Sequence, residues 1–157
     1  MRVHIATDHA GLELSAHLVE HLTGAGYEVI DHGPTAYDAE DDYPGFCIAA
    51  AEAVAGEREQ GLDSLGIVLG GSGNGEQIAA NKVKGIRAAL AWNLDTARLA
   101  RQHNDANVIA LGGRQHSLAE ATGLVEAFLA EPFSGAARHV RRIGQIAAYE
   151  ASGSTRG

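Results

Sequence analysis

The sequence has little cysteine, few aromatic residues and no long apolar run. Cys47 is the only cysteine in 157 residues, which excludes an intramolecular disulfide and any metal or iron–sulfur site built on several cysteines. No run of about 18 apolar residues occurs, so we expect no transmembrane helix, and the N-terminus lacks the apolar core of a signal peptide. Basic residues are outnumbered, and the net charge of −8 disfavours nucleic acid and anionic membranes as partners. We therefore expect a cytoplasmic enzyme or small-molecule binder.

The length and composition are those of one ordinary globular domain. A chain of this size buries roughly two thirds of its unfolded surface, so it needs no metal or disulfide to fold. We expect a single domain over residues 1–150 and a frayed C-terminal tail over residues 151–157.

Apolar runs alternate with segments of helical periodicity along the chain. The expected strands are residues 3–7, 27–31, 64–69, 86–91 and 107–112. The expected helices are residues 12–22, 45–56, 76–82, 94–103, 117–130 and 134–150, and residues 32–43 form a polar, acidic loop. This alternation predicts an α/β fold: a three-layer αβα Rossmann-like sandwich with a five-stranded parallel sheet and an extra C-terminal helix. Such sheets bind ligands at the carboxyl ends of their strands.

A glycine-rich loop over residues 70–76 follows the third strand. Its glycines let backbone N–H groups approach a ligand at a helix N-terminus, where they can hold a phosphate or a developing oxyanion. A P-loop requires Lys and Ser or Thr after the last glycine, but Glu76 and Gln77 follow Gly75. No register fits the dinucleotide fingerprint either, so the loop favours neither ATP nor NAD.

Glu76 directly follows these amides. A carboxylate beside an oxyanion hole can remove a proton alpha to a carbonyl while the amides hold the enediolate oxygen. The helix N-terminus would lower the pKa of Glu76 and burial would raise it, and the sequence leaves both possibilities open. A purely structural role, as a first-turn glutamate facing the helix dipole, is the alternative.

Several motifs together resemble a known family. They are Asp8-His9-Ala10-Gly11, Asp42-Tyr43-Pro44, Gly71-Ser72-Gly73-Asn74-Gly75-Glu76, Ala79-Ala80-Asn81-Lys82, Arg87, His103-Asn104, Gly112-Gly113-Arg114 and the Arg138/Arg142 pair. In this combination the chain resembles the type B ribose-5-phosphate isomerases, within the ribose/galactose group of sugar-phosphate isomerases. The resemblance covers about residues 2–150. It implies reversible isomerisation of ribose 5-phosphate and ribulose 5-phosphate through an enediolate, with no cofactor and no metal.

The resemblance also implies roles for individual residues. Many members carry a cysteine base at the end of the third strand, where this chain has Gly70, so it resembles the branch that uses a glutamate, here Glu76. Cys47 is then a small buried residue. The resemblance assigns His103 to ring opening, with Asn104 beside it. It also places the Ser72 hydroxyl near the enediolate.

The remaining substrate contacts surround this centre. We expect Asp8 either to bind sugar hydroxyls or only to cap the following helix. His9 is expected to bind the phosphate or to assist Asp8. Tyr43 is expected to line the sugar site or only to pack against its neighbours. The loop residues expected to bind substrate are Gly71, Gly73, Asn74 and Gly75.

The resemblance implies that three arginines are the phosphate ligands, a role that suits guanidinium groups because they bind phosphate in a bidentate manner. Arg138 and Arg142, at i and i+4, share a helix face and are joined by Arg114. A solvated basic face is the alternative for the pair. In the family the site lies at a subunit interface, which implies a homodimer or a dimer of dimers.

Three other functions remain open at this point. One is the same chemistry on a four- or six-carbon sugar phosphate, because the catalytic groups would look alike. The second is a non-catalytic sugar-phosphate sensor, and the third is a nucleotide-binding module. A sensor need not keep both Glu76 and His103, and the glycine loop lacks the lysine that a nucleotide site uses.

Overall fold

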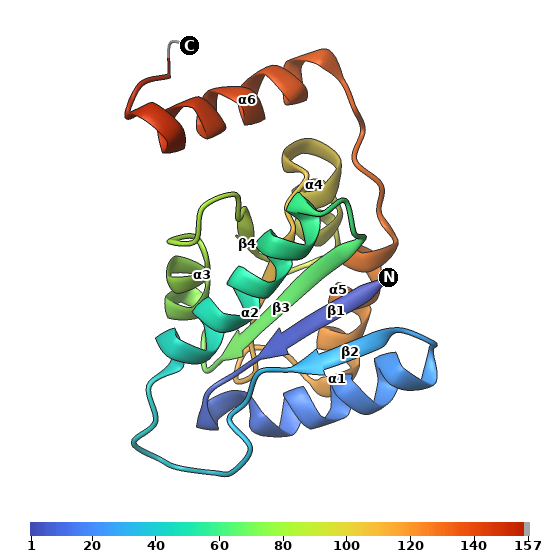
Figure 1. The fold of residues 1–157 in the computed structure, drawn as a ribbon. Helices are drawn as coiled ribbons and strands as arrows, with labels where there is room; N and C mark the ends of the chain where they lie inside the picture. Colours follow the sequence, from blue (N-terminus) through green and yellow to red (C-terminus); the bar gives the residue numbers. More distant parts are fainter. Residues whose placement is uncertain (156–157) are drawn as a thin grey trace.

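The computed structural model describes residues 1–155, which form a five-stranded parallel sheet with helices on both faces (Figure 1). The strands are β1 (Arg2–Ala6), β2 (Glu28–Asp31), β3 (Ser64–Gly70), β4 (Ala88–Leu90) and β5 (Val108–Gly112). A short 3₁₀ helix, η1 (His9–Gly11), leads into α1 (Leu12–Gly24). The other helices are α2 (Tyr43–Glu59), α3 (Asn74–Ala80), α4 (Leu94–Asn104), α5 (Leu118–Ala130) and α6 (Ala137–Ser152). The predicted α/β sandwich is confirmed.

The strands lie in the order β2-β1-β3-β5-β4, and every neighbouring pair is parallel. After β1 the chain places β2 on one side of the sheet. It then returns to β3, next to β1, and places β4 and β5 on the other side. This reversal of strand order is a topological switch point. In open α/β sheets, the crevice outside the carboxyl ends of such strands is where ligands bind.

Both faces of the sheet are covered by apolar helix surfaces. The helices α1, α4 and α5 cover one face with buried side chains that include Leu18, Ala97 and Phe128. The helices α2 and α3 cover the other, with Cys47, Val54 and Ala80 among the buried residues. All seven residues of β3 are buried, as expected for a central strand between two helical layers.

Several element boundaries differ from the prediction. The strand β4 is only three residues long, and α3 begins at Asn74, two residues earlier than expected. The last helix begins at Ala137 rather than at residue 134, because Gly135 has a φ of 63°, which a right-handed helix does not accommodate. It continues to Ser152, so the first two residues of the predicted frayed tail are helical. Arg156 and Gly157, also assigned to that tail, lie outside the described residues.

The helix α6 lies apart from the sheet and packs on α4 (Figure 1). The buried residue of α6 is His139, whereas Val140, Ile146 and Tyr149 are exposed. Its second half is held to the body by a hydrogen bond from the Gly85 N–H to the Glu150 carboxylate. No helix within residues 1–155 is long and apolar enough to span a bilayer.

Candidate active site

The carboxylate of Glu76 lies at the carboxyl end of β3. Glu76 is in the first turn of α3, and its side chain turns back over the glycine loop toward Gly70. A Cβ atom on Gly70 would lie 1.9 Å from Glu76 Oε1, well inside contact distance. The residue is only 4% exposed. Glycine at position 70 therefore leaves the space in which this buried carboxylate sits.

The surroundings raise the pKa of Glu76 above its ordinary value. Burial is the largest cause, because it disfavours the charged form, and the nearby Asp8 carboxylate adds to it. The backbone N–H groups of Glu76 and Gly73 favour the ionised form and partly offset this rise. Of the two effects that the sequence left open, burial therefore prevails. A raised pKa makes a carboxylate a stronger base near neutral pH.

The glycine loop is tightly enclosed by its neighbours. Gly73 has a φ of 82°, and a Cβ there would lie 2.8 Å from the backbone carbon of Leu111. A Cβ on Gly75 would meet the Tyr43 ring at 2.5 Å, so this ring covers the start of α3. The Ser72 hydroxyl accepts a hydrogen bond from the Asn74 N–H at 3.3 Å. The first N–H groups of a helix have no acceptor within it, and among the described residues the Gly75 N–H makes no hydrogen bond, which leaves a donor at this loop.

The turn after β5 brings Arg114 over the same loop. The Gly113 N–H donates to the Gly70 carbonyl at 2.7 Å, and the Arg114 N–H donates to the Gly71 carbonyl at 3.2 Å. The Arg114 Nη1 lies 3.5 Å from the position of a Cβ on Gly71. The side chain is exposed, so a guanidinium group is available beside the loop.

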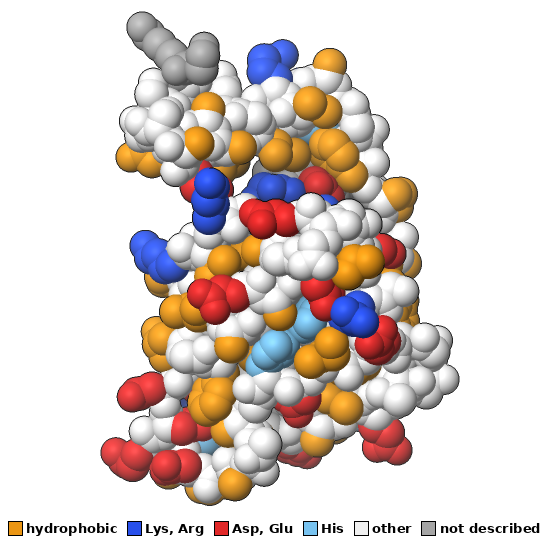
Figure 2. Space-filling model, viewed as in Figure 1, with side chains coloured by type: hydrophobic (Ala, Val, Ile, Leu, Met, Phe, Trp, Pro, Cys, Tyr) orange, Lys and Arg blue, Asp and Glu red, His pale blue; other side chains and the backbone are white. Residues whose placement is uncertain are grey.

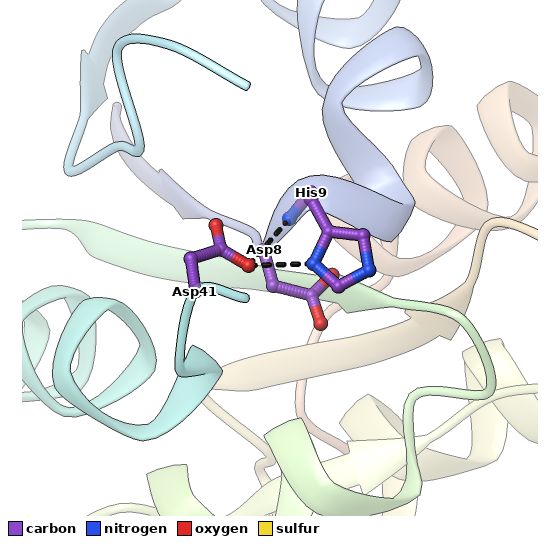
Figure 3. Close-up of side chains that lie close together, drawn as sticks. All are labelled: Asp8, His9 and Asp41. Atoms are coloured by element: carbon purple, nitrogen blue, oxygen red, sulfur yellow. Dashed lines mark hydrogen bonds and ion pairs between the residues drawn. The ribbon is translucent and has the colours of Figure 1, made fainter. Parts of the chain in front are cut away.

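Asp8 and His9 enter from the end of β1 and meet Asp41 (Figure 3). Asp8 caps η1, since its Oδ1 accepts the Ala10 N–H at 2.9 Å, which confirms the predicted capping contact. Asp41 Oδ1 accepts the His9 N–H at 3.1 Å and lies 2.6 Å from His9 Nδ1. The sequence analysis did not single out Asp41, because nothing in the acidic loop distinguishes it from its neighbours.

The same three side chains are the group of described residues that could hold a metal ion. One ligand atom from each of Asp8, His9 and Asp41 lies within 4.8 Å of the others. However, the Asp41 carboxylate and the His9 imidazole are already hydrogen-bonded to each other. This Asp41–His9 pair accounts for the short distances in the group without a metal ion.

The other predicted site residues lie at the opposite edge of the sheet. His103 and Asn104 end α4, which runs back toward the start of β5. The Asn104 carbonyl accepts a hydrogen bond from Arg87 Nε at 2.8 Å. Arg138 and Arg142 are exposed on α6, which packs against α4.

A buried histidine links two of these residues. The rings of His103 and His139 are 4.3 Å apart, and Arg138 Nε donates to His139 Nε2 at 3.1 Å. Burial lowers the pKa of His139, and His103, Arg138 and Arg142 lower it further. A neutral His139 keeps Nε2 free to accept from Arg138, whereas protonation would set two donors against each other.

The site residues therefore form two separate groups within one chain. Glu76 and Asp8 lie at the carboxyl edge, whereas His103 and Arg142 belong to elements at the amino edge. The seven residues of β3 between the two edges span about 20 Å, at roughly 3.3 Å per residue. Lys and Arg side chains gather where α6 meets the body, and Asp and Glu side chains gather at the far end (Figure 2). One chain alone does not bring the predicted catalytic residues together.

Cys47 lies in the core beneath the carboxyl edge. Its side chain is buried, as predicted, and burial raises the pKa of the thiol to about 12, with smaller contributions from Glu76 and Asp8. A thiol with that pKa is protonated near neutral pH and is a poor nucleophile or base.

Known proteins share both the sequence and the fold. The chain is 57% identical over 150 residues to the ribose-5-phosphate isomerase B of Mycolicibacterium paratuberculosis, covering 96% of this chain and 92% of that protein. It is 41% identical over 149 residues to the Escherichia coli protein of the same name, covering 95% and 96% of the two chains.

A solved structure is similar over nearly the whole chain. It is the ribose-5-phosphate isomerase B from Mycoplasma genitalium with bound ribulose-5-phosphate, which superimposes with a TM-score of 0.90 at 42% identity. The match covers 96% of this chain and 97% of that one. The sequence model of the ribose/galactose isomerases matches residues 3–146. This chain therefore belongs to the ribose/galactose isomerase family of enzymes.

Proposed function

We propose that this protein interconverts ribose 5-phosphate and ribulose 5-phosphate. The observation that carries the proposal is the place of the Glu76 carboxylate, buried at the end of β3 beside the glycine loop. A family relative with the same fold is described with ribulose-5-phosphate bound, which supports a five-carbon sugar phosphate as the substrate.

Glu76 acts as the base in this proposal. Its carboxylate takes the proton from C2 of the open-chain aldose, the electrons of that C–H bond form the C1–C2 double bond, and the C1=O π electrons move onto O1 to give the enediolate. The O2 hydroxyl proton then passes to O1. The carboxyl group returns its proton to C1 as the C2=O bond forms, which gives the ketose. The raised pKa of Glu76 supports this role, because a base is most effective when its pKa is close to the working pH.

The glycine loop stabilises the enediolate. The donors come from the backbone N–H groups of residues 72–75. The Asn74 N–H already donates to the Ser72 hydroxyl and the Gly73 N–H faces the Glu76 carboxylate. The Ser72 and Gly75 N–H groups are therefore the ones left to bind the enediolate oxygen, with the Ser72 hydroxyl beside them. Fixed donors of this kind act where charge develops during the reaction. Asp8 and Tyr43 line the sugar site together with Gly71.

A second copy of the chain completes the site. His103 and Asn104 of one copy act in ring opening at the Glu76 of the other, because they lie at opposite edges of the sheet within a single chain. Arg138 and Arg142 of that copy bind the phosphate together with Arg114 and His9. The smallest assembly with a complete site is thus a homodimer, and a dimer of dimers is also consistent.

The test is ketose formation from ribose 5-phosphate by the purified protein, with EDTA present because no step uses a metal. Turnover is expected for the wild-type protein and for Glu52→Gln, a control at an exposed helix position. Glu76→Gln should retain ribose 5-phosphate binding and lose most turnover.

Two results would contradict the proposal. Near wild-type turnover by Glu76→Gln would remove Glu76 as the base. No turnover by the folded wild-type protein would remove ribose 5-phosphate as the substrate and redirect the assay to four- and six-carbon sugar phosphates.

A further inference from the structure

Asp41 holds His9 through two contacts made by one oxygen (Figure 3). Asp41 Oδ1 accepts the His9 backbone N–H at 3.1 Å and lies 2.6 Å from Nδ1 of the ring. The Asp41 side chain is only 8% exposed, whereas the His9 side chain is 25% exposed. A buried carboxylate thus fixes both the backbone and the ring of a more accessible histidine.

The double contact determines which ring nitrogen carries the proton. Because Oδ1 already accepts the His9 N–H, it is an acceptor, and Nδ1 must be the donor in the second bond. Nε2 is then the ring nitrogen left for another partner. Among residues 1–155, His9 Nε2 makes no hydrogen bond, and the ring meets Tyr37 edge-on with centroids 6.0 Å apart.

The loop that carries Asp41 is itself anchored. The Asp41 N–H donates to the Asp38 carbonyl at 3.2 Å. Two residues later, Tyr43 begins α2, and its ring lies against Gly75 of the glycine loop. Asp41 therefore lies between this turn and the Tyr43 contact.

We propose that Asp41 is a positioning residue that fixes the ring and tautomer of His9 so that Nε2 faces the substrate. This proposal rests on the proposed function, in which His9 contacts the sugar phosphate. Asp41 itself does not touch the substrate. For histidines that bind metal ions, removing the partner behind the ring typically costs about 10–100-fold in affinity or activity, and we expect an effect of similar size here.

The first measurement determines the His9 tautomer in the wild-type protein. Two-bond ¹⁵N–¹H correlation spectra of protein labelled at the histidine rings distinguish a proton on Nδ1 from one on Nε2. The His9 signals are assigned by their loss in His9→Gln. At a pH where the ring is neutral, the proton is expected on Nδ1, and a proton on Nε2 would overturn the proposal.

Variants then test the effect on the reaction. We expect Asp41→Asn to lower kcat/KM by about 10–100-fold, mainly through a higher KM, because His9 contributes to substrate binding. It should also change the tautomer signature of His9, because an amide can present an N–H to Nδ1. Asp41→Glu, which keeps the carboxylate, should recover part of the loss. The matched control is Asp42→Asn, an exposed neighbour whose side chain caps no helix.

A double-mutant cycle separates positioning from a general structural effect. In the His9→Gln background, Asp41→Asn should cause almost no further loss, since its target is absent. An equal loss in both backgrounds would show that Asp41 acts independently of His9 and would overturn the proposal. The spectra also keep the two hypotheses apart. An inactive wild-type protein would contradict the proposed function, while the tautomer would still report whether Asp41 holds His9.

Discussion

Glu76 occupies the space that a side chain on Gly70 would fill. The position of a Cβ on Gly70 is 1.9 Å from Glu76 Oε1 and 2.2 Å from Glu76 Cδ. A side chain at residue 70 and the carboxylate at its present place exclude each other. The end of β3 therefore presents either a residue-70 side chain or the Glu76 carboxylate, and this chain has the second arrangement.

Gly70→Ala should displace the Glu76 carboxylate. We expect a loss of at least about tenfold in kcat, because even a small misplacement of a catalytic group slows a reaction strongly. Steady-state kinetics with ribose 5-phosphate, together with a circular dichroism spectrum, will measure this. Gly56→Ala is the matched control, because a Cβ there meets nothing within 4 Å and lies inside α2. Unchanged kcat in Gly70→Ala would mean that catalysis does not depend on the observed position of Glu76.

Glu76→Gln should stabilise the protein at neutral pH. The folded-state pKa of Glu76 is raised, so the folded chain binds more protons than the unfolded chain as the pH rises above about 4.5. The contribution of Glu76 to the free energy of unfolding is fully present below about pH 4.5, and it is lost as the pH rises through the pKa of Glu76 in the folded protein. Glu76→Gln removes the titrating group and therefore avoids this loss.

Thermal unfolding between pH 4 and pH 8 tests this effect. The gap in Tm between Glu76→Gln and the wild type should open as the pH increases, whereas exposed Glu52→Gln should show no such trend. A gap that narrows with increasing pH would contradict the raised pKa.

Cys47 should be unreactive in the folded protein. With its pKa raised to about 12 by burial, the thiol has little thiolate at pH 8 and no access to reagents. Iodoacetamide should modify it only after unfolding, as mass spectrometry can show. Cys47→Ala should keep near wild-type turnover despite some loss of stability from the cavity. Rapid labelling without unfolding, or loss of turnover in a folded Cys47→Ala protein, would point to a cysteine-based reaction.

Hybrid dimers can test whether each site uses two copies. A purified hybrid of one Glu76→Gln chain and one Arg142→Ala chain has one site with both groups intact, so about half of the wild-type activity is expected. Each variant alone should be much less active at low substrate concentration.

The matched control places both substitutions in one chain. A hybrid of that chain with a wild-type chain should be nearly inactive, because neither site then has both Glu76 and Arg142. If this control hybrid keeps about half of the activity and the first hybrid has little, the two residues act within one chain.

Much of this architecture follows from local sequence patterns. Buried strands covered on both faces are continuous apolar runs such as β3, so the order of the elements and the parallel sheet could be predicted. Errors occurred at element ends, as at β4 and at Gly135, where a few backbone contacts or one φ angle decide the boundary.

The α/β fold, the glycine loop and the types of side chain available for catalysis could be predicted, because they depend on composition and short-range spacing. Which of those side chains meet depends on the tertiary structure. It places Asp41 beside His9, although the two are 32 residues apart in the sequence, and it places the Glu76 carboxylate against Gly70. It also separates His103 from Glu76 by the length of a strand. Such relationships arise from packing between distant segments, which burial and chain topology fix and which local spacing does not encode.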